Sequence, residues 1–354
     1  MHPFFARTTT LLRTYGMPLA AALVLGVPIL AFVLYTLPKP ETPVAVQMAV
    51  ANTLPQMGTA PDPYAALALE AKSAIVYDLT THEVLYQKNA QVQRPLASLT
   101  KLLTVFAASD ALTASSTVTM TPTALAQVGD TADLGFTEGE TFRYGDLARL
   151  ALVSSSNTAA AAISEAAQQA KSASGPALMA SAATAAGLTQ TYANNGTGLD
   201  ESTTVSGGYG SAHDVVTLAG QLLTRAPAIA RSTVQSSITI NSLTGTSHTL
   251  KNTDPDIVKF PNPLLSKTGF TDLAGGNLVV VYDAGVGHAI AIAVLGSSRD
   301  GRFKDVQSLY QATSAHFAGT AYQGSMATTS APVKSPAPSN PPSVGTDASL
   351  TPVN

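Results

Sequence analysis

The stretch RPLASLTKLL, residues 94–103, sets a serine and a lysine three positions apart, at Ser98 and Lys101. Pro95 and the apolar run that follows predict that Ser98 lies in the first turn of a helix, where backbone N–H groups and the helix dipole favour a developing negative charge. Lys101 follows one turn later on the same face, so its amine can reach the serine oxygen and, with a lowered pKa, act as its base. Taken alone, this pattern more often means a helix cap followed by a solvated lysine.

Two further motifs change that interpretation. A Ser-Ser-Asn motif at 155–157 follows a helical pattern at 146–153, and alone it is an interhelical turn with a polar cap. A Lys-Thr-Gly motif at 267–269 lies on a strand pattern that begins at Leu264, and alone it is an edge strand with a lysine. In the order Ser-x-x-Lys, Ser-x-Asn, Lys-Thr-Gly, the three form the signature of penicillin-binding enzymes and serine β-lactamases.

Composition restricts the class of protein further. The chain has 354 residues, of which 45% are hydrophobic and 12% are charged, and its net charge is −3. A sizeable core is therefore available, and nothing argues for electrostatic binding of nucleic acid, since there is no basic patch or charged arm. The chain contains no cysteine, which excludes disulfides, thiol nucleophiles and cysteine metal sites.

The N-terminal region predicts a membrane anchor. Residues 17–37 carry no charge and, as a helix, reach about the 30 Å of a bilayer core. Two arginines precede this run and only Lys39 follows closely, so we expect residues 1–16 in the cytoplasm and the rest of the chain outside. A cleaved signal peptide is the alternative, but it needs a shorter apolar core, and the nearest Ala-x-Ala lies downstream at 49–51.

Two proline-rich segments delimit the folded part of the chain. Residues 38–63 hold six prolines and are expected to form an extended linker. Residues 319–354 hold six more among Ser, Thr, Ala and Gly, which predicts a disordered tail. The catalytic domain should therefore occupy residues 64–318.

Hydrophobic periodicity predicts strands near both ends of this domain and helices between them. The chain is therefore expected to be an α/β protein of the α+β type, in which helices pack a mostly antiparallel sheet and a helical subdomain is inserted in the middle. Strands are predicted at 73–77, 83–87, 264–270, 277–283 and 289–295, and helices at 97–112, 146–153, 158–169, 212–223 and 303–317.

With the three motifs placed, the chain resembles the serine-type D-Ala-D-Ala carboxypeptidases, the low-molecular-mass penicillin-binding proteins. The similarity covers about residues 70 to 300 and implies a β-lactamase/transpeptidase-like fold. It is carried by AKSAIVYDLTTHEVLYQKNAQVQRPLASLTKLLTVFAA at 71–108, GETFRYGDLARLALVSSSNTAAAAI at 139–163, TGLDESTTVSGGYGSAHDVVTLA at 197–219, TLKNTD at 249–254 and LLSKTGFTDLAGGNLVVV at 264–281.

The resemblance implies catalytic roles for four residues. Ser98 would be the acylated nucleophile, and Lys101 would take its proton. Ser155 would relay a proton to the leaving D-alanine. Asn157 would hold Lys101 and the substrate amide.

It also implies a set of substrate-binding residues on the third motif. Lys267 would attract the substrate carboxylate and lower the pKa of the catalytic lysine, and Thr268 would hydrogen-bond that carboxylate. Gly269 would let the substrate backbone lie close along the strand. The backbone N–H groups of Ser98 and Phe270 would form the oxyanion hole.

The reaction implied is attack on the D-Ala-D-Ala peptide carbonyl, release of D-alanine and hydrolysis of the acyl-enzyme. The partners implied are peptidoglycan stem peptides, with β-lactams as inhibitors, and no metal or other cofactor is needed. Together with the N-terminal helix, this implies a single-pass protein of the bacterial cytoplasmic membrane with its catalytic domain outside the cytoplasm.

Some positions depart from the family pattern. Thr158 stands where an acidic residue is usual, and His213 stands where arginine or lysine is commoner, which leaves the substrate preference open. Arg299 and Arg302 follow the last strand, where charged residues are normally solvated, although they could contact substrate.

Three alternative functions stay open. A DD-endopeptidase uses the same residues. A class A β-lactamase needs a deacylating glutamate between the second and third motifs, where only Glu165 and Glu201 occur, and Glu201 follows a Gly-Leu-Asp pattern seen in carboxypeptidases. A non-catalytic wall-binding protein on the same fold would usually show a broken motif, whereas all three motifs are intact here.

Overall fold

The structure, a computed structural model, describes residues 62–129, 135–285 and 287–319. The predicted cytoplasmic segment and membrane anchor lie outside the described residues, as do the linker up to residue 61 and the tail from residue 320. Within the described ranges, no helix combines the length and the apolar character needed to cross a bilayer.

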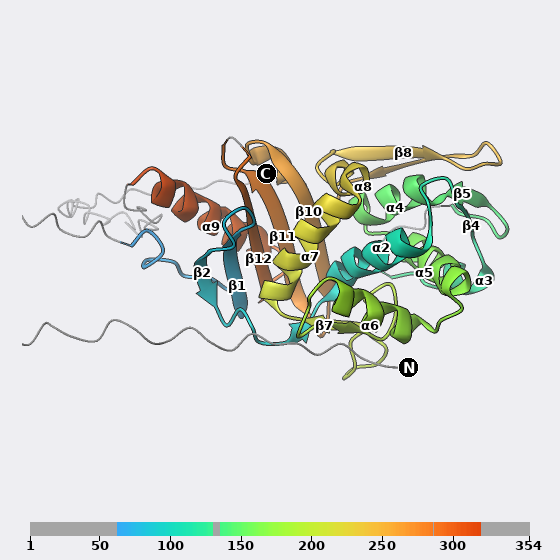
Figure 1. Cartoon of the computed structure of the whole chain (residues 1–354), viewed down its shortest axis with the longest axis horizontal. Coiled ribbons are helices and arrows are strands. Elements are labelled where there is room, and N and C mark those ends of the chain that lie inside the picture. Colours follow the sequence, from blue (N-terminus) through green and yellow to red (C-terminus); the bar gives the residue numbers. More distant parts are fainter. Residues whose placement is uncertain (1–61, 130–134, 286, 320–354) are drawn as a thin grey trace, which may run out of the picture. The chain divides into compact units, whose positions relative to one another are not determined.

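A five-stranded antiparallel sheet forms one half of the described fold (Figure 1). Its strand order is β10-β11-β12-β1-β2, so the first hairpin and the last three strands of the chain share one sheet, as the sequence predicts. The strands are β1 (Ser73–Asp78), β2 (Val84–Lys88), β10 (Pro263–Thr271), β11 (Gly275–Asp283) and β12 (Ala289–Ser297).

Both faces of this sheet are covered, which explains the nearly continuous apolar runs of its inner strands. In β11 every residue from 276 to 282 is buried. Successive side chains point to opposite faces. Val279 therefore joins the core shared with most of the helices, while Val280 joins a second core beneath α9 (Gly301–Phe317), which packs on β11 and β12.

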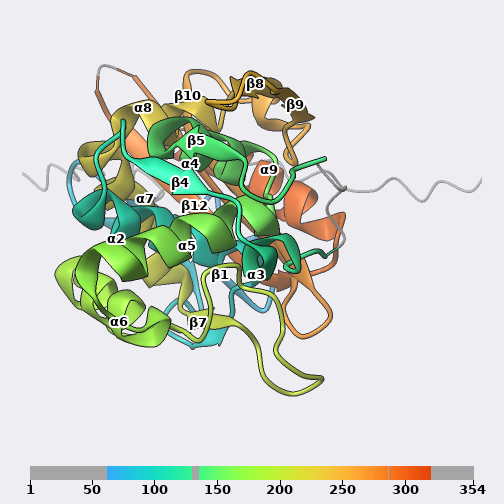
Figure 2. The ribbon, with the colours of Figure 1, turned by 90° about the vertical axis from the view of Figure 1, so that its right-hand side faces the viewer.

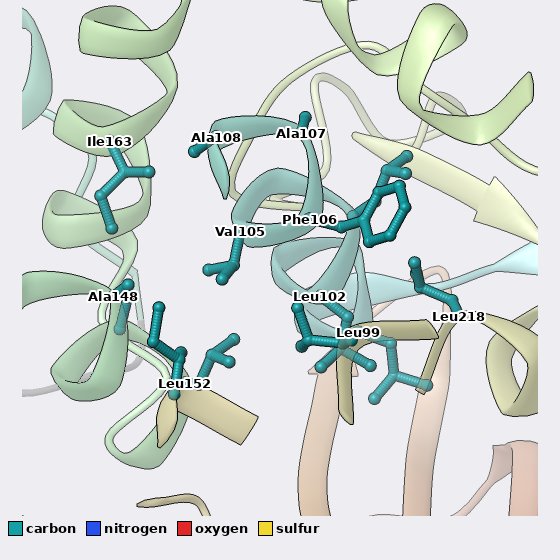
Figure 3. Close-up of a cluster of buried hydrophobic side chains, with 14 of the residues drawn as sticks. Leu99, Leu102, Val105, Phe106, Ala107, Ala108, Ala148, Leu152, Ile163 and Leu218 are labelled. Atoms are coloured by element: carbon teal, nitrogen blue, oxygen red, sulfur yellow. The ribbon is translucent and has the colours of Figure 1, made fainter. Parts of the chain in front are cut away.

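Helix α2 (Thr100–Ala111) packs against several other helices in the helical part of the described fold, which faces the viewer in Figure 2. Every residue from 100 to 108 is buried, and a helix that is buried around its whole circumference must have neighbours on all sides. Figure 3 shows its apolar side chains between Ile163 on one side and Leu218 on the other. The neighbours of α2 are α4 (Tyr144–Val153), α5 (Asn157–Lys171), α6 (Gly175–Ala185) and α7 (Ala212–Arg225).

Short elements complete the described fold and join the two halves. The helical insertion predicted from the sequence is confirmed, since helices α2 to α8 all lie in sequence between β2 and β10. The remaining elements are β3 (Arg94–Pro95), η1 (Ala97–Leu99), β4 (Thr117–Thr119), α3 (Pro122–Leu125), β5 (Thr141–Arg143), β6 (Tyr192–Ala193), β7 (Gly208–Gly210), α8 (Pro227–Ser232), β8 (Ser237–Asn241), β9 (Ser247–Lys251) and η2 (Ile257–Lys259).

The helix predicted from residue 97 begins differently in the structure. A 3-10 turn, η1, precedes α2, which begins at Thr100. Ala97 has a φ of 49°, which lies in the left-handed region and is incompatible with a continuous right-handed helix. Ser98 therefore lies in a tight turn that leads into the helix.

The central position of α2 predicts a large effect on stability. Leu102 is 0% exposed, so Leu102→Ala should lower the free energy of unfolding by about 2–5 kcal/mol through lost burial and a cavity. Chemical denaturation measures this change. Val258→Ala is the control, since Val258 is 68% exposed and its truncation should change stability by less than about 0.5 kcal/mol. Equal effects of the two substitutions would contradict the packing described here.

Candidate active site

Lys101 is the centre of the site, and its amine has a complete set of acceptors. The side chain is 0% exposed, and Nζ donates to Ser98 Oγ, to Asn157 Oδ1 and to the carbonyl oxygen of Thr197, each at 2.7 Å. A protonated lysine has three donors and no acceptor, so these three oxygens account for all of its protons. The first and second sequence motifs therefore meet at one nitrogen.

The environment of Lys101 makes it a candidate base. Burial lowers the pKa of Lys101 to about 7, far below the ordinary value for lysine. A large fraction of the side chain is then neutral at physiological pH, with a lone pair next to the Ser98 hydroxyl. This is the arrangement required for general-base activation of a serine.

The backbone around Ser98 is held by the sheet and by a nearby loop. Asn277 of β11, which is 0% exposed, donates to the carbonyl oxygen of Pro95 at 3.0 Å. The carbonyl oxygen of Ala97 packs against Gly198, where an added Cβ would lie only 2.0 Å away. Gly198 also has a φ of 76°, so glycine is required there both for conformation and for space.

The second motif is a sharp turn between two helices. Ser156 caps α5, because its Oγ accepts from the N–H of Ala159 at 3.1 Å. Ser155 has a φ of 62°, a left-handed conformation that is costly for a serine and is typical of functional sites. Its Oγ accepts a hydrogen bond from Lys267 Nζ at 2.8 Å. The turn therefore directs Asn157 to one lysine and Ser155 to the other.

The third motif places a second buried lysine beside the first. Lys267 is 2% exposed, and its Nζ also donates to the carbonyl oxygen of Thr268 at 2.7 Å. Burial holds its pKa well below the ordinary value for lysine, and the positive charges of Lys101 and Arg302 act in the same direction. Asp254 acts in the opposite direction.

Strand β10 and the turn that carries Ser98 approach each other closely. A Cβ added at Gly269 would lie 2.9 Å from the carbonyl oxygen of Leu96 and 3.3 Å from the backbone nitrogen of Ser98. Beside it, Thr268 Oγ1 donates to Thr253 Oγ1 at 2.6 Å. Glycine is thus the residue that lets the third motif lie against the turn that carries Ser98.

The arginines after the last strand are part of this region. Arg302 is only 8% exposed, and its Nη1 donates to the carbonyl oxygen of Gly269 at 2.7 Å, so the expectation that it is solvated is wrong. Its position at the start of α9, which packs on the sheet, explains the burial. The guanidinium of Arg299 lies 3.9 Å from the centroid of the Phe270 ring.

The loop that supplies the third acceptor of Lys101 was not anticipated from the sequence. Asn195 Oδ1 accepts from the N–H groups of Thr197 and Gly198, at 3.2 and 2.9 Å, which fixes the loop and the Thr197 carbonyl. Asp200 accepts from Thr271 Oγ1 at 3.0 Å, which ties the same loop to the end of β10. A backbone carbonyl carries no side-chain signal, so residue type alone does not reveal this contact.

Two residues depart from the family pattern, Thr158 and His213, and two glutamates lie between the second and third motifs. All four contact residues outside the three motifs. Thr158 Oγ1 donates to the Gln127 carbonyl at 3.4 Å, and the His213 ring lies edge-on to Tyr77. Glu165 accepts from Thr121 Oγ1, and Glu201 accepts from Asn195 Nδ2 at 3.3 Å.

The fold and the paired lysines define a serine hydrolase of the penicillin-binding type. A family profile described as D-alanyl-D-alanine carboxypeptidase matches residues 58–298. The chain belongs to this family, which makes it a serine-type D-Ala-D-Ala carboxypeptidase by class. No curated protein sequence matches the chain.

Solved structures agree with this family. The D-alanyl-D-alanine carboxypeptidase from Mycobacterium tuberculosis has 25% identity and a TM-score of 0.62, over 73% of this chain and 95% of that one. A penicillin-binding protein from Listeria monocytogenes, in its ampicillin-bound form, has 26% identity and a TM-score of 0.59, over 70% and 98%. A peptidoglycan synthesis regulatory factor from Streptococcus pneumoniae shares the fold at 24% identity and a TM-score of 0.59, over 69% and 71%.

The glycine beneath the nucleophile turn gives a test of this geometry. Gly198→Ala should destabilise the protein by about 3 kcal/mol or more, because it adds a steric conflict with Ala97 to the strain of a positive φ. Gly187→Ala is the matched control, since Gly187 has a φ of 71° with nothing within 4 Å, and it should cost only about 1 kcal/mol. Urea unfolding of both variants measures the difference, and equal losses would argue against the close contact.

Proposed function

We propose that this protein is a membrane-anchored serine D-Ala-D-Ala carboxypeptidase that removes the terminal D-alanine of peptidoglycan stem peptides through an acyl-enzyme on Ser98. One observation carries the assignment of roles. The buried amine of Lys101, with its pKa lowered to about 7, lies 2.7 Å from Ser98 Oγ. A serine with such a partner is an activated nucleophile.

Acylation begins with proton transfer from Ser98 Oγ to Lys101 Nζ. The oxygen attacks the carbonyl carbon of the penultimate D-alanine, and a tetrahedral intermediate forms. The N–H groups of Ser98 and Phe270 are proposed to stabilise its oxyanion, and the Asn157 amide orients the substrate. Since the Asn157 carbonyl oxygen already accepts from Lys101, its NH₂ group is the part directed to substrate.

Collapse of the intermediate requires a proton on the leaving amine. Ser155 Oγ is the proposed donor, and it is resupplied by Lys267, whose Nζ lies 2.8 Å away. The C–N bond breaks, D-alanine leaves, and an ester joins Ser98 to the shortened peptide. The proton that Lys101 took from Ser98 then passes to Lys267, through Ser155 or water, so both lysines regain their starting states. Water attacks the ester with Lys101 as base, and Lys101 returns that proton to Ser98 Oγ as the shortened peptide leaves.

The substrate carboxylate is proposed to bind Lys267 and Thr268 at the edge of β10. In the structure the Thr268 hydroxyl donates to Thr253, so its hydrogen would rotate toward the carboxylate when substrate binds. Gly269 lets β10 lie against the turn around Ser98, since an added Cβ would contact that turn, and the edge of the strand that is proposed to bind the substrate backbone is thereby brought close to Ser98.

The remaining proposals concern inhibitors and location. Listeria penicillin-binding protein structures are in ampicillin-bound and cefotaxime-bound forms, which supports the proposal that β-lactams acylate Ser98 here. The uncharged run at 17–37 supports a single-pass anchor in the bacterial cytoplasmic membrane, with the catalytic domain outside. Both glutamates between the second and third motifs hydrogen-bond to residues outside the motifs, which supports slow deacylation.

The acyl-enzyme is tested by intact-mass spectrometry after incubation with a penicillin. We expect a stable adduct on the wild-type protein and none on Ser98→Ala. Ser115→Ala, which removes an exposed serine hydroxyl elsewhere, should keep the adduct. Intact penicillin without an adduct would contradict the proposed enzyme, and hydrolysed penicillin without an adduct would favour a β-lactamase. Release of D-alanine from a D-Ala-D-Ala peptide then tests the substrate, and cross-linked muropeptides test the endopeptidase.

The pKa of Lys101 predicts a pH dependence for acylation. Below a pH of about 7 the amine is mostly protonated and cannot accept the serine proton, so the rate constant should rise as pH increases through about 7. Lys101→Ala should lower the rate about 10²–10⁴-fold and abolish this rise. Rates of adduct formation measured on both sides of this pH give the profile. A wild-type rate that falls as pH increases through this range would contradict Lys101 as the base.

A further inference from the structure

The peptide group between Thr197 and Gly198 is held at both of its ends. Its carbonyl oxygen accepts from Lys101 Nζ at 2.7 Å, and its N–H, which belongs to Gly198, donates to Asn195 Oδ1 at 2.9 Å. A trans peptide group is planar, and its C=O and N–H point in opposite directions, so a bond at the N–H fixes the direction of the carbonyl. The amide of Asn195 and the amine of Lys101 therefore hold one and the same peptide group.

The Asn195 side chain is itself held firmly. Its Oδ1 also accepts from the N–H of Thr197 at 3.2 Å and from the Thr197 hydroxyl at 2.9 Å. Its Nδ2 donates to the carbonyl oxygen of Leu199 at 3.1 Å and to Glu201 at 3.3 Å. Gly207 packs against the same amide, since an added Cβ there would lie 2.5 Å from Nδ2 and 2.6 Å from Oδ1. Asn195 is therefore a fixed support for the peptide group.

The glycine at position 198 makes such a support necessary. Gly198 has a φ of 76°, and rotation of the peptide group by about 180° would give a negative φ, which glycine adopts as readily. The N–H would then point at Lys101 in place of the carbonyl. A protonated amine would lose one of its three acceptors, and a neutral amine would have its lone pair engaged by a donor. In both states Lys101 would be a poorer base for Ser98.

We propose that Asn195 is a positioning residue that keeps the Thr197 carbonyl directed at Lys101, and so keeps this amine in place as the base for Ser98. This inference rests on the proposed function, because Lys101 is a base only if Ser98 is the nucleophile. Asn195 acts through the peptide group and is not itself a catalytic residue.

The groups around Lys101 determine the direction of the expected effect. Its three acceptors, on the turn before α2, on α5 and on the loop at Thr197, are neutral, and Lys267 on β10 is its like-charged neighbour. The carboxylate of Glu201 contacts the Nδ2 of Asn195. Loss of a neutral acceptor disfavours the protonated amine. The pKa of Lys101 should therefore move below about 7 when the oxygen of Asn195 is removed.

Asn195→Ala and Asn194→Ala form a matched pair for the test. Both side chains are half-buried in the same loop, and Asn194 Nδ2 donates to the Ser206 carbonyl at 3.0 Å. We expect Asn195→Ala to slow acylation by a penicillin about tenfold at alkaline pH and to move the acidic limb of the profile about one pH unit lower. The loss should therefore shrink toward acidic pH, while Asn194→Ala keeps the wild-type profile. Intact-mass spectrometry at a series of times and pH values measures these rates.

Asn195→Ser separates the accepting oxygen from the rest of the amide. A serine hydroxyl can accept from the N–H groups that follow it, as asparagine does, but it does not replace the bonds of Nδ2. We expect serine to restore part of the rate and to move the acidic limb back toward the wild-type position. If Asn195→Ala does not fold, Asn195→Ser compared with Asn194→Ser takes its place, with a smaller shift expected in the same direction.

A uniform loss of rate at every pH, with the acidic limb unmoved, would overturn the proposal and leave Asn195 a structural residue. An equal effect of Asn194→Ala, or a serine variant no better than the alanine one, would overturn it as well. Failure of the proposed function is a different result, in which the wild type forms no adduct. NMR titration of the ¹³C-labelled ε-carbon of Lys101 then decides the inference, which requires a lower pKa in Asn195→Ala and an unchanged one in Asn194→Ala.

Discussion

The burial of the Lys101 amine is the constraint on which the rest of the site depends. A buried amine needs acceptors for its protons, and here they come from three separate segments: the turn before α2, the start of α5 and the loop at Thr197. Each segment must be held in place for the amine to be accommodated. The same contacts that make the burial tolerable also bring the Lys101 amine to Ser98 Oγ, so folding and the proposed reactivity share one set of interactions.

The region combines several costly features in a small volume. Lys101, Lys267 and Arg302 are all buried basic side chains, and Ala97 and Ser155 both have left-handed backbones. Desolvated charges and strained residues persist only where the surrounding structure over-determines them. The central sheet supplies this support, since Asn277 of β11 holds the Pro95 carbonyl and α9 brings Arg302 to the back of β10. The sheet thus supports the turn that carries Ser98.

Most of the fold could be predicted because its elements are long and strongly patterned. The strands β10, β11 and β12 are each nine residues long, and α2 carries a stripe of apolar residues at helical spacing, so local periodicity is sufficient. The strands β3 and β6 are two residues long and carry no periodic pattern. The left-handed turn at Ala97 was also missed, because alanine ordinarily favours a helix.

For the site, the sequence by itself determined the three motifs, their order and the elements that carry them, since each motif is local. Only the tertiary structure decided that Ser98, Lys101 and Asn157 form one hydrogen-bonded cluster and that Ser155 pairs with Lys267. It also added the Thr197 carbonyl and Arg302, which lie 96 and 33 residues along the chain from the motif groups they contact. Their roles arise from burial and from the charges around them, and neither property exists until the sheet and the helices have packed together.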